Sequence, residues 1–171
     1  MAVAPAAHVR FSVSSVVSVA IDQTVVCPSM KVMLTGAGSG LGRRVSALLA
    51  DRGIPAEATP AEHLAVAPDA DAVVHLTAGD HDALAARETN ALVGFPELLT
   101  AMSEAGVDHL VLLSSAMVYG AWPNNPVPLT EDSPVRPDSS FVFAQHLAQV
   151  EELADEWRRA RPGRTDRKSV V

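Results

Sequence analysis

The sequence predicts an α/β fold of the doubly wound class, in which a parallel sheet is covered by helices on both faces. Three short apolar runs, at 32–34, 72–76 and 109–113, have the composition of buried strands. Segments of helical composition separate and follow these runs, and strands that alternate with helices form parallel sheets. The sequence shows no internal repeat of solenoid length and no second domain.

The first half of the predicted sheet contains two strands joined by a helix. Apolar residues at helical spacing predict that helix over 41–50, and Gly53 stands where the end of a helix favours glycine. Residues 54–57 are expected to form a short second strand. Residues 60–66, which begin with proline, are expected to form one or two helical turns.

The second half adds two longer helices. Residues 81–105 have helical composition; Pro96 is expected to kink or divide this helix, and Gly106 to end it. Residues 120–140 are rich in proline and lack periodicity, which predicts a long loop before the last helix, at 141–161.

Composition and charge exclude several classes of function. Lys and Arg number 13 against 20 Asp and Glu, a net charge of −7, whereas nucleic-acid-binding proteins normally present a basic face. The single cysteine excludes an internal disulfide and a zinc site built from cysteines. No apolar run approaches the roughly 20 residues of a membrane span. We therefore expect a cytoplasmic protein that binds no nucleic acid, membrane or metal.

Residues 1–29 precede the first convincing strand. We expect them to be a non-native or disordered extension, with natural translation starting at Met30. The alternative is a signal peptide, because the apolar run 11–21 follows His8 and Arg10 and ends in small residues.

A glycine-rich turn, TGAGSGLG, joins the first strand to the first helix. Such a turn brings backbone N–H groups and the positive end of a helix dipole to a dinucleotide's diphosphate. Gly36 allows the tight turn, Gly40 the close approach of the ligand, and Gly42 the close packing of helix on strand. The alternative is a turn that binds nothing. The expected cofactor-binding residues here are Thr35, Gly36, Gly38, Ser39, Gly40, Leu41 and Gly42.

The choice between NAD and NADP stays open at this point. An acidic residue about 20 positions beyond the turn would hold the adenosine ribose of NAD, and Glu57 is the one candidate. Arg43 and Arg44 follow the last glycine and could meet the 2′-phosphate of NADP, or they could be solvated residues of the first helical turn.

Four motifs in order carry a resemblance to a known family. They are TGAGSGLG, DAVVHLTAG (71–79), ETNALVGFPELLTA (88–101) and LVLLSSAMVYG (110–120). Together they resemble the extended short-chain dehydrogenase/reductase superfamily, and most nearly its NAD-dependent epimerase/dehydratase branch. The resemblance implies a Rossmann fold, NAD or NADP as cofactor, and a small-molecule substrate such as a nucleotide sugar. Two departures are the glycine spacing, which is that of the single-domain branch, and a 53–71 segment too short for the usual strand, helix and strand.

The resemblance also implies roles for individual residues. Ser115 matches the catalytic serine or threonine that hydrogen-bonds the reacting oxygen; the alternative is a turn serine at the end of a strand. Asn90 matches the asparagine that supports the active-site lysine through water; the alternative is an amide on a helix surface. The remaining positions expected to line the cofactor are Thr77, Ala78, Gly79 and Ser114.

The family's proton-transfer pair, Tyr-x-x-x-Lys, is absent. In the family a tyrosinate takes the hydroxyl proton, and the lysine lowers the pKa of that tyrosine. Aligning Glu151 with the glutamate that usually follows the lysine places Phe143 at the tyrosine and Leu147 at the lysine. A shift of two residues places Phe141 and Gln145 at these positions, and this pair also lacks an ionisable hydroxyl and a cation.

Residue counts lead to the same conclusion without an alignment. The one tyrosine, Tyr119, lies in the exit from a strand, and the two lysines are Lys31, at the start of the first strand, and Lys168, in the tail. His146 or Tyr119 could act as a substitute base, although a histidine on a helix is more often a surface or packing residue.

The resemblance implies a longer protein with a further strand and a substrate domain. Residues 30–165 would then be a Rossmann domain truncated before its last strands. Residues 166–171 match the translation of a common sequencing-library adapter, GAT CGG AAG AGC GTC GTG, and we expect them to be an artefact. Truncation would leave the strand at 109–113 as an open sheet edge and the chain prone to aggregate. In the full-length protein the family relationship implies a homodimer through the helices at 81–105 and 141–161.

The sequence therefore supports three functional hypotheses. The first is an NAD(P)-binding domain of an epimerase/dehydratase-like protein whose redox chemistry is impaired. The second is a catalytically silent module that senses NAD(P) or serves as a scaffold. The third is an active, atypical enzyme that uses residues from outside this chain.

Overall fold

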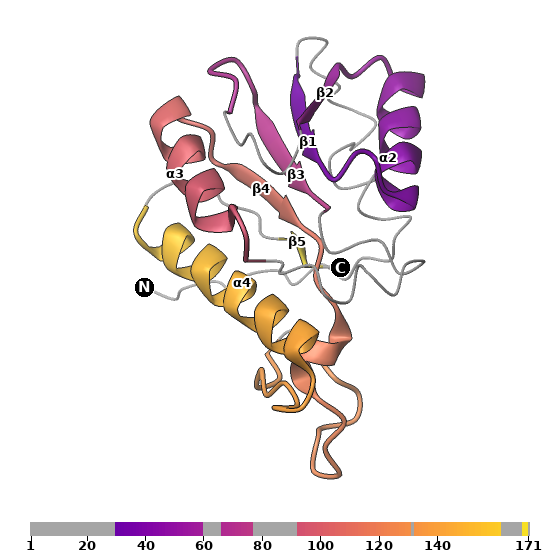
Figure 1. The fold of residues 1–171 in the computed structure, drawn as a ribbon, viewed down its shortest axis with the longest axis vertical. Helices are drawn as coiled ribbons and strands as arrows, with labels where there is room; N and C mark the ends of the chain where they lie inside the picture. The colour runs from indigo at the N-terminus through magenta and orange to yellow at the C-terminus, as the bar shows by residue number, and fades with distance from the viewer. Residues whose placement is uncertain (1–29, 60–65, 77–91, 131, 162–168, 171) are drawn as a thin grey trace, which may run out of the picture.

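The computed structural model describes residues 30–59, 66–76, 92–130, 132–161 and 169–170. In this part of the chain five parallel strands form one sheet in the order β2-β1-β3-β4-β5. The strands are β1 (Val32–Thr35), β2 (Ala56–Thr59), β3 (Ala72–His75), β4 (His109–Leu112) and β5 (Ser169–Val170). Helix α2 (Gly40–Asp51) covers one face, and α3 (Phe95–Ala105) and α4 (Val142–Arg159) cover the other (Figure 1). The predicted doubly wound α/β class is confirmed.

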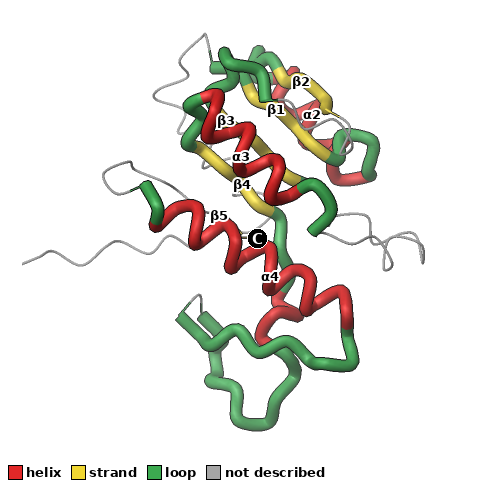
Figure 2. The backbone as a smooth tube through the Cα atoms, turned by 60° about the vertical axis from the view of Figure 1, so that its left-hand side comes forward, coloured by secondary structure: helices red, strands yellow, loops and turns green. Residues whose placement is uncertain are grey.

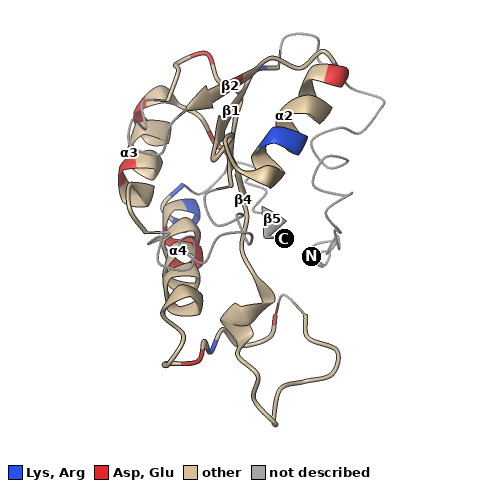
Figure 3. Ribbon diagram, turned by 45° about the vertical axis from the view of Figure 1, so that its right-hand side comes forward, with Lys and Arg blue, Asp and Glu red and all other residues tan. Residues whose placement is uncertain are grey.

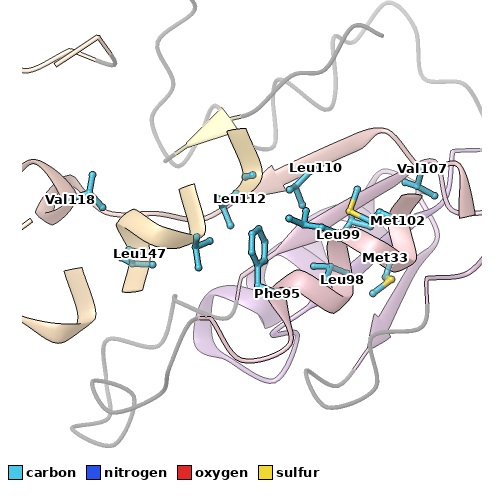
Figure 4. Close-up of a cluster of buried hydrophobic side chains, with 13 residues drawn as sticks. Met33, Phe95, Leu98, Leu99, Met102, Val107, Leu110, Leu112, Val118 and Leu147 are labelled. Carbon is cyan, nitrogen blue, oxygen red and sulfur yellow. The ribbon is translucent and has the colours of Figure 1, made fainter. Parts of the chain in front are cut away.

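Each face of the sheet has its own apolar cluster, because alternate residues of a strand point to opposite faces. In β1, Val32 and Leu34 belong to the cluster that includes Leu49 of α2. Met33, between them, belongs to the cluster of α3 and α4, which includes Phe95 (Figure 4). All four residues of β1 are buried. Burial on both faces explains why the strands are continuous apolar runs in the sequence.

The helices begin and end at the serine, proline and glycine residues that the sequence offers for these positions. The Ser39 hydroxyl accepts a hydrogen bond from the Gly42 N–H at 2.8 Å and caps α2. Gly53 and Gly106, which follow α2 and α3, have φ of 67° and 71°, a conformation that glycine adopts without strain. Pro96 lies in the first turn of α3, where a missing N–H costs nothing. Pro96 therefore lies at the start of α3, and the prediction that it kinks or divides a longer helix is not tested by the described residues.

The weaker elements differ in part from expectation. The second strand covers 56–59 instead of 54–57. A short 3-10 helix, η2 (Ala116–Tyr119), precedes the long loop, which has no helix or strand in its described residues and extends away from the sheet (Figure 2). The turns expected at 60–65 and the first part of the helix expected at 81–105 lie outside the described residues.

The edge of the sheet at β4 is the clearest correction. We expected the strand at 109–113 to be an open edge, but β5 pairs with it in parallel at Val111 and Leu112. That expectation is therefore wrong for these two residues. The assignment of residues 166–171 to a sequencing adapter is not tested by this pairing.

Candidate functional site

The carboxyl ends of the strands meet at one edge of the sheet. Thr35, Thr59 and His75 end β1, β2 and β3, and the register pairs Thr35 with each of the other two. The chain leaves β1 for β2 on one side and then crosses to β3 on the other. In open parallel sheets ligands bind at such a switch point, outside the carboxyl ends of the strands.

The glycine turn lies at this switch point, between β1 and α2. Gly36 has φ of 74°, and its carbonyl oxygen accepts a hydrogen bond from Ser39 N–H at 3.0 Å. A Cβ added at Gly42 would lie 2.1 Å from the Gly36 oxygen, so only glycine permits this approach of α2 to the turn. A Cβ at Gly38 would meet nothing within 4 Å. The turn is thus tightly packed on its inner side and open at Gly38.

The start of α2 is positively charged. Arg43 and Arg44 are exposed on its first turn, and the acidic Asp51 lies at its other end (Figure 3). The Arg43 guanidinium donates a hydrogen bond to the Gly38 carbonyl oxygen at 2.5 Å. In the described part of the chain neither arginine forms an ion pair with a carboxylate. The open side of the turn and these two cations fit an anionic group such as a diphosphate.

Glu57 lies inside β2, and its expected role at the ribose of the cofactor stays a prediction. It is the second residue of β2, in register with Met33, and it lines a cavity of about 370 Å³ together with Lys31 and Asp69. This cavity lies at the amino ends of the strands, opposite the glycine turn. Because β2 begins two residues later than predicted, its last residue is Thr59 and not Glu57.

A buried histidine at the same edge was missed in the sequence. His75 is 3% exposed, and its Nδ1 lies 2.8 Å from the Thr35 Oγ1. Burial lowers the pKa of His75 to about 4, so the ring is neutral at ordinary pH. Its centroid is 5.2 Å from that of Phe95, at the start of α3. The one signal available beforehand was a histidine inside the apolar run AVVHL.

The two serines after β4 have different surroundings. Ser115 is half-buried at the start of η2, and its hydroxyl accepts a hydrogen bond from Met117 N–H at 3.3 Å. Ser114 is buried, and its hydroxyl donates to the carboxylate Oε1 of Glu151, which is also buried. Ser114 thus joins the end of β4 to α4, whereas Ser115 is half-buried and bonds within its own turn.

The expected substitutes for the tyrosine and lysine lie on one face of α4. Phe143, Leu147 and Glu151 are four residues apart, which places them in one row along a helix. Leu147 is 1% exposed and packs in the α3–α4 cluster, which also holds Val118 (Figure 4). Phe143 is half-buried against the same cluster. In this row Glu151 is the one ionisable group, and it is already bound by Ser114.

The residues of the alternative register are arranged differently. Phe141 precedes the first turn of α4, and its ring centroid is 6.0 Å from that of Phe143. Gln145 donates from Nε2 to the Ser139 carbonyl oxygen at 2.7 Å. Tyr119, one of the two proposed substitute bases, is half-buried against the α3–α4 cluster.

Part of the expected site lies outside the described residues. These positions are Thr77, Ala78, Gly79 and Asn90. No helix in the part of the chain that the structure describes is long and apolar enough to cross a bilayer.

Comparison with known proteins identifies the family. The model of the NAD dependent epimerase/dehydratase family matches residues 56–164, more than half of the chain. A search of the curated proteins found no match to this chain.

Several solved structures are similar to the chain. A short-chain dehydrogenase/reductase superfamily protein from Agrobacterium tumefaciens, solved with bound NAD, is 26% identical with a TM-score of 0.61, over 82% of this chain and 48% of that one. The UDP-N-acetylglucosamine 4-epimerase of Bacillus cereus is 20% identical with a TM-score of 0.65, over 82% and 54%. The dTDP-glucose 4,6-dehydratase of Streptomyces venezuelae, a double mutant with NAD bound, is 23% identical with a TM-score of 0.61, over 82% and 55%.

The chain spans about half the length of these solved structures. The two below 25% identity support the fold, and the family model supports the family. On that match, the chain belongs to the NAD dependent epimerase/dehydratase family.

Proposed function

We propose that the chain is the NAD(P)-binding domain of an epimerase/dehydratase-like protein acting on a nucleotide sugar or a related small molecule. The observation that carries this proposal is the glycine turn at the carboxyl end of β1, where Gly42 admits no side chain and Gly38 faces open space. Family membership and the NAD-bound neighbours support the choice of ligand.

The residues of the turn fit a dinucleotide's diphosphate. Ser39 holds the first turn of α2, so the helix dipole is directed at the switch point. Arg43 lies across the turn at the Gly38 carbonyl and adds positive charge. When bound, NAD accepts or supplies a hydride; the residues of this chain bind and orient it.

The proton-transfer step is impaired in this proposal. Ser115 can donate a hydrogen bond to a substrate oxygen, but a base within reach is also required. The row of Phe143 and Leu147 is apolar, and the buried Glu151 below it supports placing these two residues at the family's Tyr and Lys positions. A phenylalanine has no proton to exchange, and a leucine provides no cation to lower a neighbour's pKa.

Loss of this chemistry also supports the second candidate function, a silent module that senses NAD(P) or serves as a scaffold. Such a module needs the turn and not the base. Restoring the pair with Phe143→Tyr and Leu147→Lys in a full-length protein separates the two functions, because only a domain with an otherwise intact catalytic site would gain hydride transfer.

The binding test uses the open side of the turn. Gly38→Val adds a side chain where the protein has room, so we expect an unchanged melting temperature. The same side chain occupies the space that a diphosphate would need, so NADH and NADPH affinities measured by fluorescence titration should fall at least tenfold.

Ala47→Val, exposed on α2, is the matched control, and its affinity should equal that of the unsubstituted chain. If the unsubstituted chain binds neither dinucleotide at millimolar concentration, or if Gly38→Val binds as tightly as Ala47→Val, the proposed site is wrong.

A further inference from the structure

The ends of β1 and β3 carry a buried polar pair, whereas the preceding pair of these two strands on the same face is apolar. Thr35 and His75 are paired in the register and follow the apolar pair Met33 and Val73 on the same face. Thr35 is 0% exposed and His75 is 3% exposed. Burying two polar groups costs free energy unless they bond to each other, and two aliphatic residues would fill the same space without that cost.

Three contacts hold the pair in place: one between the side chains, one through the backbone and one from a neighbouring ring. The Thr35 hydroxyl and the His75 Nδ1 are 2.8 Å apart. The Thr35 carbonyl oxygen also accepts from Leu76 N–H at 3.2 Å, so β3 holds this residue through both its backbone and its side chain. The Phe95 ring, 5.2 Å from that of His75, packs against the histidine from α3.

The location of the bond connects it to the glycine turn. Thr35 is the last residue of β1 and the first of TGAGSGLG, and Gly36 follows it with φ of 74°. A rotation at Thr35 would therefore move every N–H group of the turn. The bond crosses the point between β1 and β3 where the direction of strand order changes, which is also where the ligand is proposed to bind.

We infer that His75 is a positioning residue, which holds Thr35 through its hydroxyl and so sets the direction of the glycine turn for a dinucleotide. This inference rests on the proposed function, because it concerns the same ligand. In this inference His75 acts through Thr35 and not by its own contact with the dinucleotide. Its ring is neutral at ordinary pH, since burial keeps its pKa near 4, so the bond persists throughout the physiological range.

The test compares hydroxyl loss with hydroxyl retention at one position. Thr35→Val keeps the shape and loses the hydroxyl, whereas Thr35→Ser keeps the hydroxyl and loses a methyl group. We expect the dissociation constant for NADH to rise about tenfold in Thr35→Val and to stay within threefold in Thr35→Ser, although the serine variant also has a changed melting temperature. His75→Phe should match Thr35→Val, and the double variant should be no weaker than either single one.

Val73→Ala serves as the structural control. It removes buried apolar contacts from the same face of β3, two residues before His75. Its melting temperature should fall while its NADH affinity stays unchanged. If His75→Phe does not fold, the Val and Ser variants of Thr35 still decide the question.

Equal affinities of Thr35→Val and Thr35→Ser in a chain that binds NADH would overturn this inference alone. Failure of the unsubstituted chain to bind either dinucleotide would overturn the proposed function together with the inference.

Discussion

At the scale of single residues, burial determines what the polar groups of the site can do. His75 and Glu151 are both buried, yet each is bound by a hydroxyl from a neighbouring element, Thr35 and Ser114 respectively. Ser115 is the accessible hydroxyl after β4. In the proposed function, the described residues of the site therefore serve for cofactor binding and for one hydrogen bond to a substrate.

Burial of His75 also predicts a specific acid sensitivity. The folded state keeps the ring neutral down to about pH 4, whereas an unfolded histidine titrates near 6.5. Between these values the unfolded state binds more protons, so this group lowers the free energy of unfolding as pH falls, by about 3 kcal/mol over the full interval. Denaturant unfolding at pH 7, 6, 5 and 4 should show His75→Phe losing less stability than the unsubstituted chain.

The exposed His109 provides the comparison for this measurement. His109→Gln, which replaces an exposed histidine of β4, is the matched control substitution. An identical pH dependence in the unsubstituted chain and in His75→Phe would show that the ring is already charged in the folded protein.

At the scale of elements, the strands were predictable because a strand buried on both faces has a continuous apolar sequence. The strands β1, β3 and β4 begin at the residue where their apolar runs begin. The strand β2 was misplaced by two residues because AEAT lacks the large apolar residues that mark the other strands, and its residues are exposed or half-exposed. Pairing across strands, which brings His75 to Thr35, depends on register and could not be predicted from one sequence.

The row on α4 could be predicted as a pattern, but its degree of burial could not. Spacing alone puts Phe143, Leu147 and Glu151 on one face. Whether that face lies at an open site or against the core depends on how α4 packs on α3 and η2. The structure places Leu147 in the core cluster, at 1% exposure.

This packing predicts the result of restoring a lysine in the chain without ligand. Leu147→Lys would place an ammonium group in an apolar cluster, so the free energy of unfolding should fall by roughly 3 kcal/mol or more. Phe143→Tyr should change it by less than about 1 kcal/mol, because that ring is half-buried and a hydroxyl can reach water. Chemical denaturation measures both, with Gln149→Lys on the exposed side of α4 as the control. A Leu147→Lys variant as stable as Gln149→Lys would contradict the packing described for α4.

At the scale of the whole molecule, the outer faces of α3 and α4 carry acidic residues that affect whether two copies can associate through these helices. Their exposed residues include Glu97, Glu104, Glu152 and Glu156. The homodimer that the family relationship implies would join these two helices in each copy and bring acidic side chains together. Such a contact is disfavoured at low ionic strength and favoured when salt screens the charges.

The far edge of the sheet leads to the last prediction. Strand β5 covers β4 through two residue pairs, and the long loop, which extends away from the sheet, exposes large apolar side chains, Val127 at 96% among them. Deleting residues 166–171 removes β5 and leaves the backbone of Val111 and Leu112 unpaired, which is the kind of edge that joins strands of other molecules. We expect the shortened chain to lose about 1–2 kcal/mol of unfolding free energy and to scatter more light on heating. A chain shortened by the same length at its other end, lacking residues 1–6, should melt like the parent. If removing residues 166–171 changes neither the melting temperature nor the light scattering, the pairing of β5 with β4 does not contribute to the stability of the fold.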